Sequence, residues 1–148
     1  MNRDLEQAVE ELRLHNATFV VVKEGAVLGM GRGRGVGELV ASADELGGRA
    51  RGGALADRIV GKAAAFVAEA MGISSVHAAL LSEPGRDVLL RAGIKVRYET
   101  LVPAIRNRAG DGSCPMELLV EDCREAADAL TLLRARVTGE LPGGTRVP

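Results

Sequence analysis

Residues 75–81 have the sequence SVHAALL, and this run decides the fold class. It is apolar at nearly every position, which is typical of a strand covered on both faces, as in a parallel sheet. Residues 84–92 follow with a proline in the first turn and a glycine after the last, and they predict a short helix. In residues 94–98 apolar and charged side chains alternate, which predicts a half-exposed strand. Strand, helix and strand in this order form a right-handed βαβ unit with parallel strands.

The N-terminal third predicts a helix followed by a hairpin. Residues 3–14 carry apolar side chains at helical spacing, and residues 17–22 are rich in β-branched residues. A turn at residues 23–25 leads to a return strand from residue 26. Residues 38–46 predict a second, short helix.

Two longer helices are predicted in the rest of the chain. One is a central helix over residues 54–71, and the other begins at Pro115 and carries Cys123 on its buried stripe. We therefore expect one α/β domain over residues 1–140, with a disordered tail over 141–148. The strand at 75–81 should be central and parallel to that at 94–98. One core should contain Val20, Val22, Ile59, Phe66, Val76, Ala78, Leu80, Ile94 and Val96.

The composition limits the classes of function. The 148 residues are 47% hydrophobic and carry a net charge of −1, so no overall field attracts nucleic acid or an anionic membrane. Aromatic residues make up 2%, too few for base-stacking platforms, and this disfavours RNA binding through Arg32, Arg34, Arg49 and Arg51. No apolar run reaches the roughly 20 residues that span a bilayer, and the acidic N-terminus is no secretory signal. We therefore expect a cytoplasmic protein with no membrane partner.

The two cysteines, Cys114 and Cys123, fall on the predicted last helix. Nine residues of helix separate them by about 13 Å, whereas a disulfide needs Cα atoms within about 7 Å. Cys114 precedes Pro115, so its thiol would lie at a helix N-terminus, where amides and the helix dipole lower a cysteine pKa. The alternative is a small capping residue packed under a loop. Glu117 would reach back to a cap amide of the same helix.

Polar side chains of the predicted central helix are candidates for an anion site. Lys62 lies at the edge of its apolar face with Arg58 one turn earlier, a like-charge pair that a bound anion would explain. The alternative is a lysine that extends along an apolar surface. Asp57 falls in the first turn, where it either complements the helix dipole or binds a ligand.

Two further features have structural interpretations. The glycine-rich run over residues 29–37 contains neither G-x-G-x-x-G nor the G-K-[ST] ending of phosphate loops. We expect it to bend a strand. His77 lies within the apolar run and is expected to be a hydrogen-bonded core residue.

Five segments together resemble the DUF1893 family of small prokaryotic proteins. They are ADRIVGKAAA (56–65), SEP (82–84), GIKVRYE (93–99), LVP (101–103) and CPME (114–117), and the similarity covers roughly residues 4–125. That family is similar in fold to cytidine deaminases. The resemblance implies a three-layer, cytidine deaminase-like mixed sheet flanked by helices.

The resemblance does not extend to zinc chemistry. Zinc deaminases use H-x-E at one helix start and P-C-x-x-C at the next. The corresponding positions here are Lys62, Gly85 and Val88, which do not bind zinc, so the resemblance implies no metal and no cofactor. The family motifs imply a pocket with Cys114, Lys62 and Asp57 as catalytic groups, and with Glu83, Pro84 and Glu117 as ligand-binding groups.

We therefore predict a zinc-free deaminase-fold protein that binds a small anionic or nucleotide-like molecule. Cys114 would act on it, with Lys62 as anion anchor or proton donor. The alternative is a non-catalytic sensor or protein-interaction module that has kept the fold without the chemistry. A partly open Cys114 thiol within about 4–6 Å of Lys62 would favour chemistry. Assembly of identical copies is left open.

Overall fold

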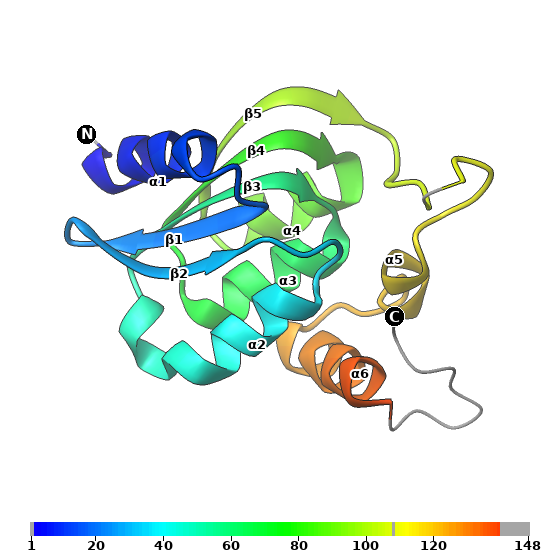
Figure 1. The fold of residues 1–148 in the computed structure, drawn as a ribbon. Coiled ribbons are helices and arrows are strands. Elements are labelled where there is room, and N and C mark those ends of the chain that lie inside the picture. Colours follow the sequence, from blue (N-terminus) through cyan, green and yellow to red (C-terminus); the bar gives the residue numbers. More distant parts are fainter. Residues whose placement is uncertain (1, 108, 140–148) are drawn as a thin grey trace.

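The structure, a computed structural model, describes residues 2–107 and 109–139. It has three layers, with a five-stranded mixed sheet between one helix on one face and the remaining large helices on the other (Figure 1). The strand order is β2-β1-β3-β4-β5. Strand β1 is antiparallel to β2 and β3, whereas β3, β4 and β5 are parallel. The predicted fold class and the parallel βαβ unit are confirmed.

The elements follow one another in the order that the figure labels. They are α1 (Arg3–Leu14), β1 (Phe19–Lys23), β2 (Ala26–Gly31), α2 (Gly37–Leu46), η1 (Gly47–Ala50), β3 (Ala54–Val60), α3 (Lys62–Met71), β4 (Ser75–Ser82), α4 (Glu83–Arg91), β5 (Lys95–Val102), α5 (Pro115–Leu119) and α6 (Ala126–Thr138). Among the described residues, no helix is both long and apolar enough to cross a membrane. The predicted tail over 141–148 lies outside the described residues.

The predicted central helix over residues 54–71 is wrong, because its first half is a strand. Residues 54–60 form β3, which pairs with β1 on one side and β4 on the other. Gly61 is extended, and the helix begins only at Lys62. A short apolar run suits a buried strand as well as a helix, and the two neighbouring strands decide between them here. Asp57 therefore lies on a strand, and Arg58 does not share a helix with Lys62.

The prediction of a single last helix from Pro115 is also wrong, because the structure has two helices in this part of the chain. The first, α5, ends at Leu119, and α6 begins at Ala126 after an irregular segment. Cys123 lies in that segment and is half-buried, so it belongs to no helical stripe. The separation estimated for two cysteines on one helix therefore does not apply. Both cysteines are nevertheless free thiols in the structure.

The apolar side chains form two clusters on opposite faces of the sheet, where a single core was expected. Val20 and Val22 pack under α1 with Ala8, Leu12 and Ala56, whereas Phe66, Val76, Ala78 and Ile94 belong to the larger cluster beneath α2, α3 and α4. The middle strand of the sheet is β3, and β4 lies beside it. A sheet with helices on both faces necessarily has an apolar layer on each.

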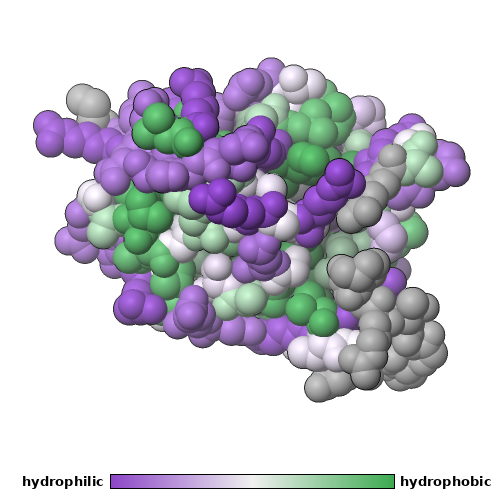
Figure 2. Space-filling model, viewed as in Figure 1, coloured by the Kyte–Doolittle hydropathy of each residue, from purple (hydrophilic) through white to green (hydrophobic). Residues whose placement is uncertain are grey.

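Ile59 was expected in the core but is 52% exposed, and Leu80 and Val96 are only half-buried. Leu55 and Val60 of β3 belong to the same cluster, although residues an odd number apart point to opposite faces in a regular strand. The alternation therefore shifts by one residue near the end of β3. Ile59 consequently points to the face of α1, beyond the part that α1 covers. Figure 2 shows an apolar surface over the strands beside α1.

Candidate functional site

The N-terminal ends of α3 and α4 meet at the C-terminal ends of the parallel strands. A Cβ added to Gly85 would lie 2.9 Å from the carbonyl carbon of Gly61, so the approach of the two backbones requires a glycine at position 85. Ser82 caps α4, because its Oγ accepts a hydrogen bond from the Gly85 amide at 3.0 Å. Ligands in open α/β sheets bind outside the carboxyl ends of the strands, which is the edge where these helices begin.

An open cavity of about 530 Å³ lies between the start of α3 and one side of α4, along which it extends from Pro84 to Arg91. Its walls contain Lys62 from α3 and five residues of α4: Pro84, Asp87, Val88, Leu90 and Arg91. Sequence reasoning missed Asp87 and Arg91. Their spacing of four residues on a predicted helix was the available signal, because such residues share a helix face.

Lys62 is held in place by the segment that follows α5. Its Nζ donates a hydrogen bond to the Glu121 carbonyl oxygen at 2.6 Å and lies 5.8 Å from the centre of the Phe66 ring. An ammonium group has three N–H donors, so two remain for a ligand. The ammonium group therefore lies over an aromatic ring, and the side chain also lines the cavity.

Glu117 caps α3 rather than its own helix. Its carboxylate accepts hydrogen bonds from the amides of Lys62 at 2.7 Å and Ala63 at 2.8 Å. A Cβ on Gly61 would overlap this carboxylate. The predicted chemistry, a carboxylate on cap amides, is therefore present, but on a helix distant in the sequence. Tertiary contact decided which N-terminus received it.

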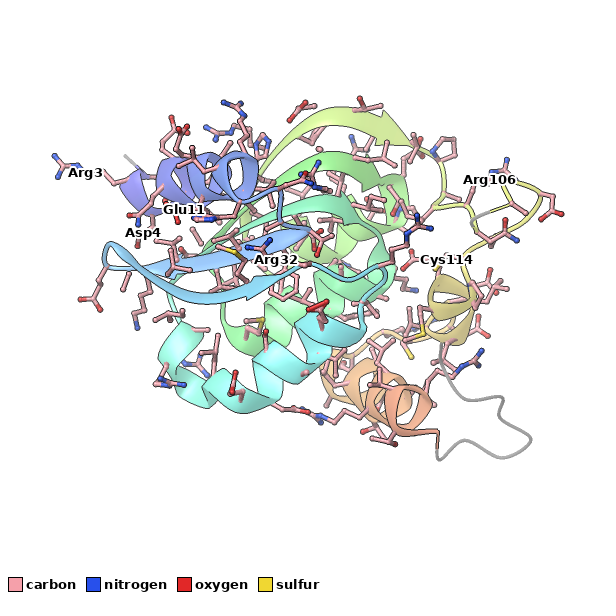
Figure 3. All side chains as sticks on the ribbon, viewed as in Figure 1. Arg3, Asp4, Glu11, Arg32, Arg106 and Cys114 are labelled. Carbon is pink, nitrogen blue, oxygen red and sulfur yellow. The ribbon has the colours of Figure 1, made fainter. Side chains whose placement is uncertain are left out.

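Two other carboxylates bind pairs of consecutive amides in the same way. Asp4 accepts hydrogen bonds from Glu24 and Gly25 in the β1–β2 turn, at 2.9 and 3.1 Å. Glu38 accepts from the amides of Arg32 and Gly33, which belong to the glycine-rich run. That run therefore folds around a carboxylate of the chain itself, and Arg32 lies far from Cys114 (Figure 3).

Cys114 lies where the loop after β5 meets α5 (Figure 3). It is the residue before Pro115, as predicted, and it is half-buried with its amide bonded to the Ile105 carbonyl at 3.0 Å. Its side chain accepts no capping hydrogen bond from the helix. The charge of Lys62 instead affects the pKa of the other thiol, that of Cys123. Burial raises the pKa of Cys123, and the Lys62 ammonium offsets part of this effect.

Asp57 is a buried carboxyl group on β3, level with Phe19 and Ala78 on the neighbouring strands. Burial raises its pKa to about 7, although backbone amides of Ile59 and Arg58 lower it in part. The Ile59 amide donates to its Oδ1 at 3.2 Å. The Arg58 side chain points elsewhere, because its Nε donates to the Ala17 carbonyl at 2.6 Å. Asp57 therefore titrates near neutral pH without an ion-pair partner among these groups.

The structure brings together some of the predicted site residues. Lys62 and Pro84 line one cavity, and Glu117 bonds to the backbone beside Lys62. Glu83 is the exposed first residue of α4, immediately before Pro84. Asp57, Glu83, Cys114 and Glu117 do not form part of the cavity wall.

The chain belongs to the DUF1893 family, a domain of unknown function whose family model, TM1506, matches residues 7–137. A solved DUF1893 family protein from Thermotoga maritima is similar over 91% of both chains, with a TM-score of 0.82 and 20% identity. The dCMP deaminase of cyanophage S-TIM5 is similar over 66% of this chain and 99% of its own length, with a TM-score of 0.51 and 15% identity. No curated protein matches the sequence.

These likenesses establish a deaminase-like fold, and the residues at the helix starts do not suit the zinc of deaminases. The residues that the sequence motifs lead us to expect at the three ligand positions, Lys62, Gly85 and Val88, offer no thiolate, imidazole or carboxylate. Within the part of the chain that the structure describes, no three His, Cys, Asp or Glu side chains are grouped to hold a metal ion. No step of a reaction is therefore derived through zinc.

Proposed function

We propose that this protein binds a small anionic molecule, of nucleotide size or smaller, in the cavity between the start of α3 and α4. The observation that carries this proposal is the cavity itself. Its wall has two cations, Lys62 and Arg91, against one carboxylate, Asp87, and its apolar contacts are Pro84, Val88 and Leu90. Its volume of about 530 Å³ falls in the range typical of small-molecule sites, roughly 300–1,000 Å³.

Chemistry on the bound molecule is a further step of the proposal, and it would require Cys114 and Asp57, which do not form part of the cavity wall, to reach that molecule. Cys114 would act as a nucleophile and Asp57, with its pKa near neutrality, as an acid or base. A cytoplasmic location is also part of the proposal. The second candidate function is a non-catalytic sensor. Two contacts favour it, since the Glu117 carboxylate caps α3 and Lys62 fastens the segment after α5, so both groups serve the fold.

Ligand binding is tested by identifying what copurifies, with native mass spectrometry, and by thermal shift. The probes are adenosine monophosphate, inorganic phosphate and adenosine. We expect stabilisation by the first two and none by adenosine, because the cations recognise the phosphate. Lys62→Met and Arg91→Met should abolish the shift. Lys23→Met removes a half-buried lysine near the β1–β2 turn and should leave the shift unchanged.

Equal stabilisation by adenosine would contradict recognition of the anion. A shift that survives in Lys62→Met and Arg91→Met would place the ligand elsewhere. To separate an enzyme from a sensor, the bound molecule is recovered after incubation with the wild type and with Cys114→Ser. Unchanged ligand in both samples favours the sensor.

A further inference from the structure

Strand β5 forms an open edge of the sheet over its full length of eight residues. Among residues 2–107 and 109–139, no strand pairs with its outer side. Most of its side chains are exposed, and Tyr98 is 41% exposed. A long unpaired edge presents free N–H and C=O groups to other chains unless a bulge, a proline or a covering element blocks it.

The two edges of this sheet differ in that respect. Strand β2 is shorter, has a register shift opposite Val21 and Val22, and contacts α2. Strand β5 has no proline and no shift in its pairing with β4. Its edge is therefore the one that remains able to pair.

The orientation of the backbone identifies which groups are free. The Lys95 amide donates to the Ser74 carbonyl at 3.1 Å, toward β4. Successive amides of an extended strand point to opposite sides, so those of Val96 and Tyr98 point outward. An antiparallel partner strand would bond to these groups.

The charged side chains of β5 are complementary to a second copy of the same strand. Arg97 and Glu99 both contact His77, with Arg97 Nε at 3.0 Å from Nδ1 and Glu99 Oε2 at 3.2 Å from Nε2. They therefore lie on the same face of the sheet. Arg97 also pairs with Glu6 of α1, with Nη2 at 2.8 Å from Oε1. The Arg97 and Glu99 side chains nevertheless remain 47% and 63% exposed, which leaves room for further partners.

We propose that this protein forms a symmetric dimer by antiparallel pairing of β5 with β5 of a second copy, with Tyr98 on the twofold axis. In this register Arg97 of each copy lies opposite Glu99 of the other, and opposite charges at such positions stabilise a strand pair. The alternative register, with Arg97 on the axis, places two guanidinium groups opposite each other. The occupant of this edge is therefore a second copy of the chain, in one register.

The test is the molar mass in solution, measured by light scattering with gel filtration over a range of protein concentrations. We expect the wild type to approach twice the mass of one chain as concentration rises, and less so at high salt because the ion pairs are exposed. Arg97→Glu alone and Glu99→Arg alone should each remain monomeric. Mixed in equal amounts, they should form a heterodimer. One copy then carries two carboxylates on this strand and the other carries two guanidinium groups, so both cross-strand pairs join opposite charges.

The mixing experiment separates failed pairing from failed folding, since misfolded variants would not recover a dimer together. The register is tested with Tyr98→Cys in a Cys114→Ser, Cys123→Ala background. Oxidation should give a covalent dimer, whereas Thr100→Cys on the same strand should not. A wild type that is monomeric at every concentration, a dimer that persists in Arg97→Glu, or equal cross-linking through residue 100 would overturn the proposal.

Discussion

At the scale of the residue, three carboxylates occupy positions that a bound anion commonly takes. Asp4, Glu38 and Glu117 each accept hydrogen bonds from two consecutive backbone amides. Such amide pairs attract phosphate and carboxylate groups alike. The amides of the glycine-rich run and of the start of α3 are already bonded to carboxylates of the chain itself. An anionic ligand in the cavity beside α4 would therefore depend on the cationic side chains there instead of on these amides.

Asp57 is the residue whose environment predicts a pH dependence. In the unfolded chain it loses its proton near pH 3.8, whereas in the folded protein its pKa is about 7. Between these values the folded state holds one more proton, so stability falls as pH rises and then levels off. The difference corresponds to at most about 4 kcal/mol, at about 1.36 kcal/mol for each pH unit.

We expect Asp57→Asn to remove this loss of stability, since asparagine resembles the protonated acid in shape. Urea unfolding of both proteins at pH 5 and pH 8 measures the loss. The variant should be more stable than the wild type at both pH values, and by a larger margin at pH 8 than at pH 5, because the folded and unfolded pKa values bracket pH 5. An identical pH dependence in the two proteins would show that Asp57 is not the titrating group.

The two thiols give a second prediction at this scale. Burial raises the pKa of Cys123, and thiolate is the reactive form, so Cys114 should alkylate faster near neutral pH. Lys62→Met should slow Cys123 further, because the ammonium offsets part of that rise, and should leave Cys114 unchanged. Limited iodoacetamide labelling, read by peptide mass mapping, measures both rates, with Lys23→Met as the control. Slower labelling of Cys114 in Lys62→Met would instead place these two residues in one site.

At the scale of the element, the site depends on how closely α3 and α4 begin. Each helix starts within one residue of the end of a strand, and Gly85 allows the start of α4 to contact the backbone of Gly61. The Glu117 carboxylate joins α5 to the start of α3, so segments from three parts of the chain meet around the α3 N-terminus.

Gly85→Ala should therefore destabilise the protein. The added Cβ would lie 2.9 Å from the Gly61 backbone, and backbone at a helix start cannot move without shifting the helix. Overpacking of this kind costs about 1–3 kcal/mol. Thermal and urea unfolding measure the change. Gly48→Ala, with nothing within 4 Å of the added atom, is the matched control and should change stability little. Equal effects of the two substitutions would contradict the close approach.

At the scale of the whole molecule, the deaminase-like sheet carries residues at the helix starts that do not suit the metal. Lys62 begins α3 and Gly85 is the third residue of α4, and the sequence motifs lead us to expect them where zinc deaminases have metal ligands. We expect elemental analysis of the purified protein to find no stoichiometric zinc, and chelator to leave its melting temperature unchanged. About one zinc per chain, removable by chelator with loss of stability, would contradict this expectation.

The sequence by itself determined the layered α/β fold, the hairpin and the βαβ unit. These elements have local signals, because β-branched runs, a proline in the first turn and a glycine after the last act within a few residues. The family motifs also led to Lys62 and Pro84, which do share a cavity.

Only the tertiary structure decided that residues 54–60 form a strand. The backbone hydrogen bonds of this strand are made with β1 and β4 and not within the segment itself. It also decided that Glu117 caps α3 and that Lys62 acts on Cys123. Such contacts join residues far apart in the chain, and local propensity carries no information about them. The raised pKa of Asp57 has the same origin, because desolvation is produced by what packs around a carboxyl group and not by its neighbours in the sequence.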